Sequence, residues 1–246
     1  MIDVHCHLTA REFEGRIEAV VDEALRSGVR AIVTSGLGYD DCLKALKISD
    51  YKVIYPSLGI TPYELSGYEK VLQLIEKERN RIVAIGEVGL DFWKGERDQW
   101  DLQRKVFEEF IDLAKSLDLP LVIHSRSAGK YALEILFRKR AERVVMHAFD
   151  GKVTYAANAA ERGFMFSIPP SVARSSQKQK LVKRLPLDSL LLESDAPVLA
   201  PAPNQLNHPK NVRVSAEWIA KLKNIPFERV VEKTGENAVE LLGLRV

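Results

Sequence analysis

Short apolar runs rich in β-branched residues alternate with longer amphipathic segments along the whole chain. The apolar runs occupy residues 1–4, 31–34, 53–58, 82–86, 121–123, 143–146, 164–167 and 190–193. Runs of this length that are apolar at nearly every position are typical of parallel strands buried on both faces. The pattern therefore predicts eight parallel strands.

The segments between and after these runs have apolar residues at helical spacing, as from Ile17 to Leu25 in the first of them. Gly28 stands where a glycine commonly follows a helix. Thr234 is a candidate N-cap of the last helix, and Gly243 is its candidate C-terminal glycine. The predicted helices are 11–26, 41–48, 68–78, 98–116, 129–140, 153–162, 175–183, 215–223, 227–233 and 236–242.

Eight strands, each followed by a helix, is the count of a closed TIM-type (β/α)₈ barrel. Such a barrel needs roughly 250 residues, and the chain has 246 with no linker-like stretch. We therefore expect one α/β domain over residues 1–246. An open, doubly wound sheet gives the same alternation, and the positions of the polar residues separate the two folds better.

Side chains of the types that bind metals gather at the carboxyl ends of the predicted strands. Four of the five histidines and two acidic residues lie there: His5, His7, Glu87, His124, His147 and Asp195. In a TIM barrel the carboxyl ends of the strands form the active-site face. This placement favours the barrel and predicts one ring of six polar side chains around its mouth, the end where those strands finish.

Taken singly, each of these six residues has an ordinary structural explanation, such as a buried hydrogen bond, a helix cap or an ion pair. Together they are costly to bury unless they are paired or coordinated, and a cation removes that cost for all six. Six ligands are too many for one catalytic ion that keeps an open position. Two ions that share a carboxylate fit better. Imidazoles favour Zn, Mn, Fe, Co or Ni, and carboxylates also suit Mg.

Net charge excludes one class of function. With 36 basic and 34 acidic residues, the formal charge is only +2. A protein that coats nucleic acid without specificity usually has a larger basic excess. An enzyme with a local basic rim beside its metals remains compatible with this balance.

The chain has the features of a cytoplasmic protein. Its two cysteines, Cys6 and Cys42, form no disulfide framework, which suits a reducing compartment. The N-terminus lacks a signal-peptide pattern, and no apolar run approaches 18 residues. We expect no membrane association, and nothing implies an obligate protein partner.

Six short segments resemble, in order, motifs of the TatD-type deoxyribonucleases, which are members of the metal-dependent amidohydrolase superfamily. The segments are DVHCHL at 3–8, GEVGLDF at 86–92, HSRSA at 124–128, HAFDG at 147–151, ESDAP at 193–197 and NHP at 207–209. They are similar to D-x-H-x-H-L, G-E-x-G-L-D-[YF], H-x-R-x-A, H-x-F-x-G, E-[TS]-D-[AS]-P and N-x-P. The resemblance extends over essentially the whole chain.

The resemblance implies a TIM barrel with two metal sites. One ion is expected on His5, His7, Glu87 and Asp195, and the second on the bridging Glu87 with His124 and His147. Members of the family hydrolyse phosphodiester bonds in DNA, often from a 3′ end, and commonly use magnesium or manganese. DNA is therefore the expected substrate.

One position departs from the family pattern. The family usually carries G-I-H-P after the third strand, and this chain has Thr61 in place of the histidine. That histidine is not one of the six ligands. Thr61 keeps a hydroxyl group but does not shuttle a proton near neutral pH. The change therefore bears on contacts with the substrate or the attacking water, not on metal binding.

We assign expected catalytic roles to three carboxylates. Asp195 is both a ligand and the general base for the attacking water, and Glu87 bridges the ions. Glu193 precedes Asp195 by two residues, and either orients a ligand or relays a proton. Asp3 is expected to support the His-x-His turn, and His208 to have a loop or substrate-edge role without binding metal.

Three residues are expected substrate contacts. The guanidinium of Arg126 is suited to hold a phosphate in a fork, and Thr61 offers its hydroxyl group. Trp93, next to Phe92, is available to stack on a base. The alternative for this aromatic pair is to cap the barrel mouth.

Two other functions are compatible with the same scaffold. One is an amidohydrolase that acts on a cyclic amide, lactone or other ester with the same metals. Because Glu87 takes the place of a carboxylated bridging lysine, the sequence favours phosphodiester hydrolysis. The other is a catalytically silent binding protein, against which the complete set of six ligand types argues.

Overall fold

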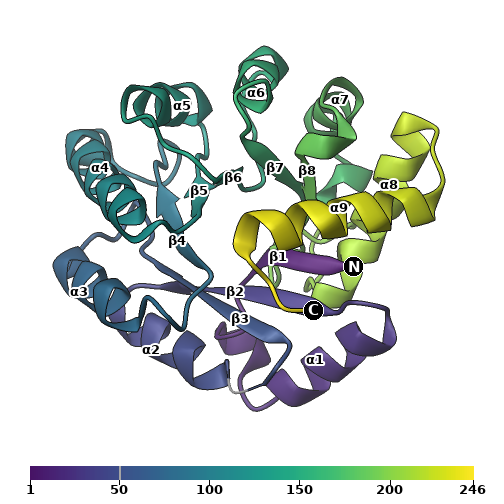
Figure 1. Cartoon of the computed structure of the whole chain (residues 1–246), viewed down its shortest axis with the longest axis horizontal. Helices are drawn as coiled ribbons and strands as arrows, with labels where there is room; N and C mark the ends of the chain where they lie inside the picture. Colours follow the sequence, from purple (N-terminus) through teal and green to yellow (C-terminus); the bar gives the residue numbers. More distant parts are fainter. Residues whose placement is uncertain (50) are drawn as a thin grey trace.

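Eight parallel strands in sequential order form the centre of the fold (Figure 1). The computed structural model describes residues 1–49 and 51–246. Each strand pairs in parallel with the next one along the chain. The strands are β1 (Ile2–Cys6), β2 (Ala31–Leu37), β3 (Ile54–Gly59), β4 (Ala84–Gly89), β5 (Leu121–His124), β6 (Val144–Met146), β7 (Met165–Ile168) and β8 (Leu190–Leu192).

Backbone hydrogen bonds between β1 and the residues after β8 close the sheet. Asp195 N donates to His5 O at 2.9 Å, and His7 N donates to Ala196 O at 2.7 Å. A doubly wound sheet would reverse its strand order part-way, and this sheet does not. The prediction of a TIM-type barrel is therefore confirmed. The closure lies at the same end of the barrel as the predicted metal ligands.

Most of the helices surround the strands in a ring, and the last helix lies across the barrel near the start of β1 (Figure 1). None of those in residues 1–49 and 51–246 is both long and apolar enough to cross a membrane. They are α1 (Ile17–Arg26), α2 (Tyr39–Ile48), α3 (Tyr68–Glu78), α4 (Trp100–Leu117), α5 (Gly129–Arg138), α6 (Val153–Ala160), α7 (Ser176–Arg184), α8 (Val212–Lys223) and α9 (Phe227–Leu242), with short 3₁₀ turns at Arg11–Phe13, Arg97–Gln99, Pro170–Ala173, Leu187–Ser189 and Pro209–Asn211.

The last helix corrects one prediction. We expected two helices separated at Thr234, but α9 is continuous. Thr234 is buried, and its hydroxyl donates to Val230 O at 2.7 Å, one turn earlier. A threonine that satisfies its hydroxyl in this way does not need to cap a new helix. Gly28 and Gly243, with φ of 87° and 65°, follow their helices in the left-handed conformation that we expected of them.

The apolar core has two parts, separated by the strands. Side chains from the helices pack on the outer face of the sheet, against residues such as Leu121 and Ile123. Val122, which lies between them, belongs to a second cluster together with Leu241 and Leu242 of α9. Because side chains alternate along a strand, this second cluster faces the barrel interior. The C-terminal end of α9 packs against it (Figure 1).

Two glycines give opposite predictions for stability. A Cβ on Gly59 would lie 2.2 Å from Glu87 O on the neighbouring strand, whereas a Cβ on Gly235 meets nothing within 4 Å. We expect Gly59→Ala to lower the free energy of unfolding by more than about 2 kcal/mol, because β3 and β4 must separate. Gly235→Ala should raise it by about 0.5–1 kcal/mol through helix propensity. Urea denaturation of both variants measures these changes, and an unchanged Gly59→Ala variant would contradict the packing argument.

Candidate metal centre

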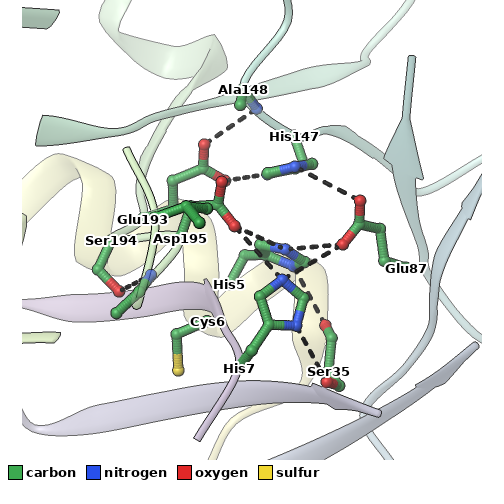
Figure 2. A network of polar contacts seen from close by, with 12 residues as sticks. His5, Cys6, His7, Ser35, Glu87, His147, Ala148, Glu193, Ser194 and Asp195 are labelled. Atoms are coloured by element: carbon green, nitrogen blue, oxygen red, sulfur yellow. Dashed lines mark hydrogen bonds and ion pairs between the residues drawn. The ribbon is translucent and has the colours of Figure 1, made fainter. Parts of the chain in front are cut away.

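The end of β1 brings two imidazoles together at the barrel mouth. His5 is completely buried, and its ring centroid lies 4.8 Å from that of His7 in an edge-to-face arrangement (Figure 2). Cys6, between them, points into the core, where its thiol donates to Val33 O at 3.5 Å. The alternation of side chains along a strand thus sends both histidines to the site and the cysteine away from it.

The carboxylate of Glu87, on β4, faces His5, His7 and His147 (Figure 2). Its Oε2 lies 3.3 Å from His5 Nε2 and 3.4 Å from His7 Nε2. Its Oε1 lies 3.6 Å from His147 Nε2 and directly beside His124 Nδ1. Each oxygen of this one carboxylate therefore faces a different pair of histidines.

Asp195 approaches the same two imidazoles from the segment after β8. Its Oδ1 lies 3.5 Å from His5 Nε2 and 3.4 Å from His7 Nε2. The strand ends at Leu192, and Asp195 has a φ of 53°. Regular alternation has therefore ended before Asp195, so the two-residue spacing of Glu193 and Asp195 does not place them on one strand face.

A second hydrogen bond orients each of the four imidazoles. For β1 the partner is Ser35 on β2: its Oγ lies 3.1 Å from His5 Nδ1, and its carbonyl oxygen lies 3.3 Å from His7 Nδ1. A proton on each of these Nδ1 atoms leaves the Nε2 lone pair directed toward the carboxylates. The partner on the second ring nitrogen selects the tautomer of a metal-binding histidine in this way.

Carboxylates orient the other two imidazoles. His124 Nε2 lies 2.9 Å from Asp91 Oδ2, and His147 Nδ1 lies 2.9 Å from Glu193 Oε2. Glu193 is fully buried, and it also accepts hydrogen bonds from Ala148 N and Ser167 Oγ. This geometry places Glu193 behind His147, in an orienting position.

The electrostatics of the cluster favour a cation. Burial alone would lower the pKa of His5, but the carboxylates of Asp195 and Glu87 raise it well above its ordinary value. The pKa of His124 likewise rises to about 9 against burial, chiefly because of the charge on Glu87. Burial would raise the pKa of Glu87, yet His124 and His147 hold it well below its ordinary value. Without a metal, imidazole protons balance the carboxylates, and a divalent cation binds by displacing those protons.

The spacing of the donor atoms fits such an ion. Ligand atoms bound to one ion at tetrahedral angles and usual bond lengths lie about 3.3–3.6 Å apart. The Nε2 atoms of His5, His7 and His147 lie 3.3 to 3.6 Å from the nearest carboxylate oxygens of Glu87 or Asp195. His5 Nε2, although buried, has no hydrogen-bond partner in the described residues. The donor set therefore fits divalent metal binding, with nitrogen and oxygen ligands only.

A cavity of about 500 Å³ opens above the cluster, and both Thr61 and Arg126 line it. The Arg126 guanidinium lies 3.7 Å from the ring centroid of Trp93, whose side chain is 62% exposed. Phe92 instead stacks on Trp100 with centroids 4.0 Å apart. The two neighbouring aromatic residues thus differ: Phe92 packs against the start of α4, whereas Trp93 is exposed beside Arg126 and is not among the residues that line the cavity.

Asp3 contacts the His-x-His segment as we expected, and His208 lies outside the metal cluster and the cavity lining. Asp3 Oδ1 accepts from Ser194 N at 2.8 Å and from His5 N at 3.3 Å, which ties β1 to the segment after β8. Burial raises the pKa of Asp3 to about 7, although its bonds with Ser194 oppose the shift. His208 lies 3.4 Å from Glu23 and is neither in the metal cluster nor among the residues that line the cavity.

Comparisons with known proteins agree with a hydrolase that has a cluster of metal-binding side chains. The family model described as TatD related DNase matches residues 2–243. The chain belongs to the TatD DNase family. The predicted family and the hydrolase class are thereby confirmed.

Individual relatives of this TatD-family chain align over nearly their whole length. A human protein named Deoxyribonuclease TATDN3 is 40% identical, with 98% of this chain and 94% of that protein covered. A Bacillus subtilis protein named Uncharacterized metal-dependent hydrolase YabD is 34% identical, with 98% of each covered. The crystal structure of YJJV, a TatD homolog from Escherichia coli K12, has a TM-score of 0.93 at 29% identity, covering 100% of this chain and 98% of that one.

Sequence reasoning missed three residues of this TatD-family site. Asp91 was visible within the GEVGLDF segment, but its partner, His124, lies 33 residues away. Ser35 follows Thr34 in a buried strand whose other residues are apolar or glycine, and this polar pair was an available signal. Lys178 lines the cavity from α7, and nothing in its local sequence distinguishes it from a solvated lysine.

The contact between Asp91 and His124 predicts a loss of metal affinity on mutation. In Asp91→Asn the side chain keeps its shape but loses the charge that orients His124 and increases its basicity. We expect Mn²⁺ to bind roughly 10- to 100-fold more weakly in isothermal titration calorimetry. Asp101→Asn, at an exposed position on α4, is the matched control and should bind as the wild type does. Equal affinities of both variants would show that Asp91 does not support the metal centre.

Proposed function

We propose that this protein is a divalent-metal-dependent deoxyribonuclease that removes nucleotides from the 3′ end of DNA by hydrolysing phosphodiester bonds. The observation that carries the proposal is the position of Glu87, with one pair of imidazoles facing each of its oxygens. A carboxylate placed in this way suits two ions that share a ligand. The name of the human relative, Deoxyribonuclease TATDN3, supports DNA as the substrate.

The chain offers two sets of ligands around the shared Glu87. His5, His7 and Asp195 would hold one ion with it, and His124 and His147 the other. Magnesium and manganese suit the carboxylates, while zinc, iron, cobalt or nickel also suit the imidazoles. When bound, such ions lower the pKa of water and neutralise charge on the phosphoryl oxygens.

Asp195 is the residue that we assign to proton transfer. Its Oδ1 lies against His5 and His7, which leaves Oδ2 to accept a proton from the attacking water. Glu193 holds His147 and the Ala148 amide in place from behind. We therefore favour an orienting role for Glu193 over a proton relay.

Arg126 and Trp93 form the part of the rim suited to nucleic acid. One face of the Trp93 ring carries the guanidinium of Arg126, and the exposure of its side chain leaves surface for a base. The Arg126 donors are suited to a phosphate oxygen. Thr61 lines the same cavity, with a hydroxyl group that can donate to the substrate.

Single-stranded DNA labelled at its 5′ end tests the reaction and its direction. Metal-free protein should leave the DNA intact, and Mg²⁺ or Mn²⁺ should produce a ladder that shortens from the 3′ end. Asp195→Asn should lower the rate at least about 10³-fold, because it removes both a ligand and the proton acceptor. Asp188→Asn, at an exposed carboxylate paired with Lys233, is the control and should retain activity.

Two outcomes would contradict the proposal. An Asp195→Asn variant with wild-type activity would remove Asp195 from the mechanism. A folded, metal-loaded protein that cleaves no DNA but hydrolyses cyclic amides, lactones or esters would place the chain among the amidohydrolases of small substrates.

Stacking on Trp93 predicts a substrate-dependent effect of mutation. Stacking of a base on an aromatic ring contributes about 1–3 kcal/mol, so Trp93→Ala should raise KM for single-stranded DNA roughly 5- to 150-fold. Bis(p-nitrophenyl) phosphate has no nucleobase, and its hydrolysis serves as the internal reference. Tyr51→Ala, at an exposed aromatic residue that does not line the cavity, should leave both substrates unaffected. An equal loss on both substrates would exclude base stacking as the role of Trp93.

A further inference from the structure

Lys178 is a buried cation in the wall of the active-site cavity. It projects from α7, retains only 7% of its exposure, and lines the cavity together with His147 and Asp195. Lysine is almost never buried to this extent unless an anion pairs with it. The surroundings of its ammonium group therefore indicate what the residue does.

The protein supplies only part of what this ammonium group needs. Nζ donates one hydrogen bond, to Ala148 O at 2.9 Å. Within residues 1–49 and 51–246, no carboxylate oxygen lies within 4.0 Å of Lys178 Nζ, so the ammonium forms no ion pair there. The nearby carboxylate of Glu193 already accepts from His147, Ala148 and Ser167. Two of the three ammonium protons are therefore available to a ligand.

The charge balance agrees with the contacts. Burial lowers the pKa of Lys178, and the more distant carboxylates of Glu193 and Asp150 only partly oppose that shift. Burial thus destabilises the charged ammonium by more than its contacts with the surrounding protein stabilise it. An anion bound in the cavity would supply the missing counter-charge.

Two hydroxyl groups from other segments that line the cavity also lack partners. Ser125 Oγ and Thr9 Oγ1 are buried and make no hydrogen bond within the described part of the chain. Both residues line the cavity. Buried polar groups are nearly always satisfied in native proteins, and those that are not require an explanation. Like the Lys178 ammonium, they are donors that acceptor oxygens of a ligand in the cavity could satisfy.

We propose that Lys178 forms an anion subsite beside the metal centre and binds a phosphate oxygen of the nucleotide held in the cavity. The inference rests on the proposed function, because it takes the ligand to be a nucleotide phosphate. Lys178 is then a substrate-binding residue contributed by a helix, outside the ring of strand-end ligands. Its hydrogen bond to Ala148 fixes the ammonium next to His147.

The test compares variants that remove the charge in different ways. Lys178→Gln keeps a donor for Ala148 O, and Lys178→Met keeps the length of the side chain without any donor. Lys180→Gln removes an exposed charge from the same helix and is the matched control. The probes are deoxyadenosine 5′-monophosphate and inorganic phosphate, each titrated calorimetrically into Mn²⁺-loaded protein.

Both Lys178 variants should bind deoxyadenosine monophosphate roughly 10- to 100-fold more weakly, as for loss of a charge-assisted hydrogen bond. Mn²⁺ affinity, measured separately, should stay within about threefold of wild type, and Lys180→Gln should bind the probes normally. The slope of log KM against log salt for single-stranded DNA should decrease by about 0.7, the value for one phosphate contact. Inorganic phosphate shows whether the subsite requires the nucleoside. If the Lys178 variants lose the same factor in affinity for both probes, Lys178 contacts the phosphate itself.

Stability distinguishes binding from a structural role. If Lys178 were only the counter-charge of Glu193, neutralising it would destabilise the fold. For an unpaired buried charge that serves binding, neutralisation leaves the thermal unfolding temperature unchanged or raises it. Lys178 variants that unfold, or that bind both probes like the wild type, would overturn the proposal. So would wild-type protein that binds neither probe.

The two proposals fail separately. If DNA is cleaved and the Lys178 variants match the wild type in cleavage and binding, the nuclease assignment stands and the anion subsite does not. If DNA is not cleaved but phosphate binding depends on Lys178, the subsite stands and the substrate is another phosphorylated compound.

Discussion

The carboxylate of Glu87, held between imidazoles from three strands, is the interaction on which the rest of the site depends. Its backbone is fixed by the close approach of β3: Ile60 N donates to Glu87 O at 2.9 Å, and Gly59 leaves no room for a side chain there. On the opposite side, His5 O accepts from Asp195 N where the barrel closes. The hydrogen bonds that complete the barrel therefore also set the positions of the donor atoms.

This arrangement costs stability without a cation and gains from one. Imidazoles and carboxylates buried at one mouth lose their hydration, and protons on the imidazoles offset the carboxylate charge. Partners on the second ring nitrogens, such as Ser35 and Asp91, hold the rings in position whether or not a cation is bound. The geometry is thus imposed by hydrogen bonds outside the cluster, so a metal meets ligands that are already oriented.

The sequence predicts that the six candidate ligands converge, because in a closed barrel the order of the strands along the chain sets their positions in space. Once strands are parallel and closed, residues at their carboxyl ends must converge, however far apart they lie in sequence. Partners that depend on side-chain reach do not follow from this rule, as the link between Asp91 and His124 shows. Local polarity also misled the prediction at Thr234, whose hydroxyl bonds within its own helix. From its sequence context Lys178 looks like a solvated lysine, and only the structure shows that it is buried.

The distribution of cations around the cavity explains how a chain of net charge +2 is suited to a polyanion. Arg126 and Lys94 line the cavity from the segments after β5 and β4, each beside an aromatic ring, while Lys178 lines it from α7. His147 and Asp150 lie between these two sides along the chain. Attraction within a Debye length of about 10 Å matters more to a substrate at the metals than the charge of distant surfaces. A few local cations and the proposed metal ions would therefore suffice, and the charge on the rest of the surface can remain balanced.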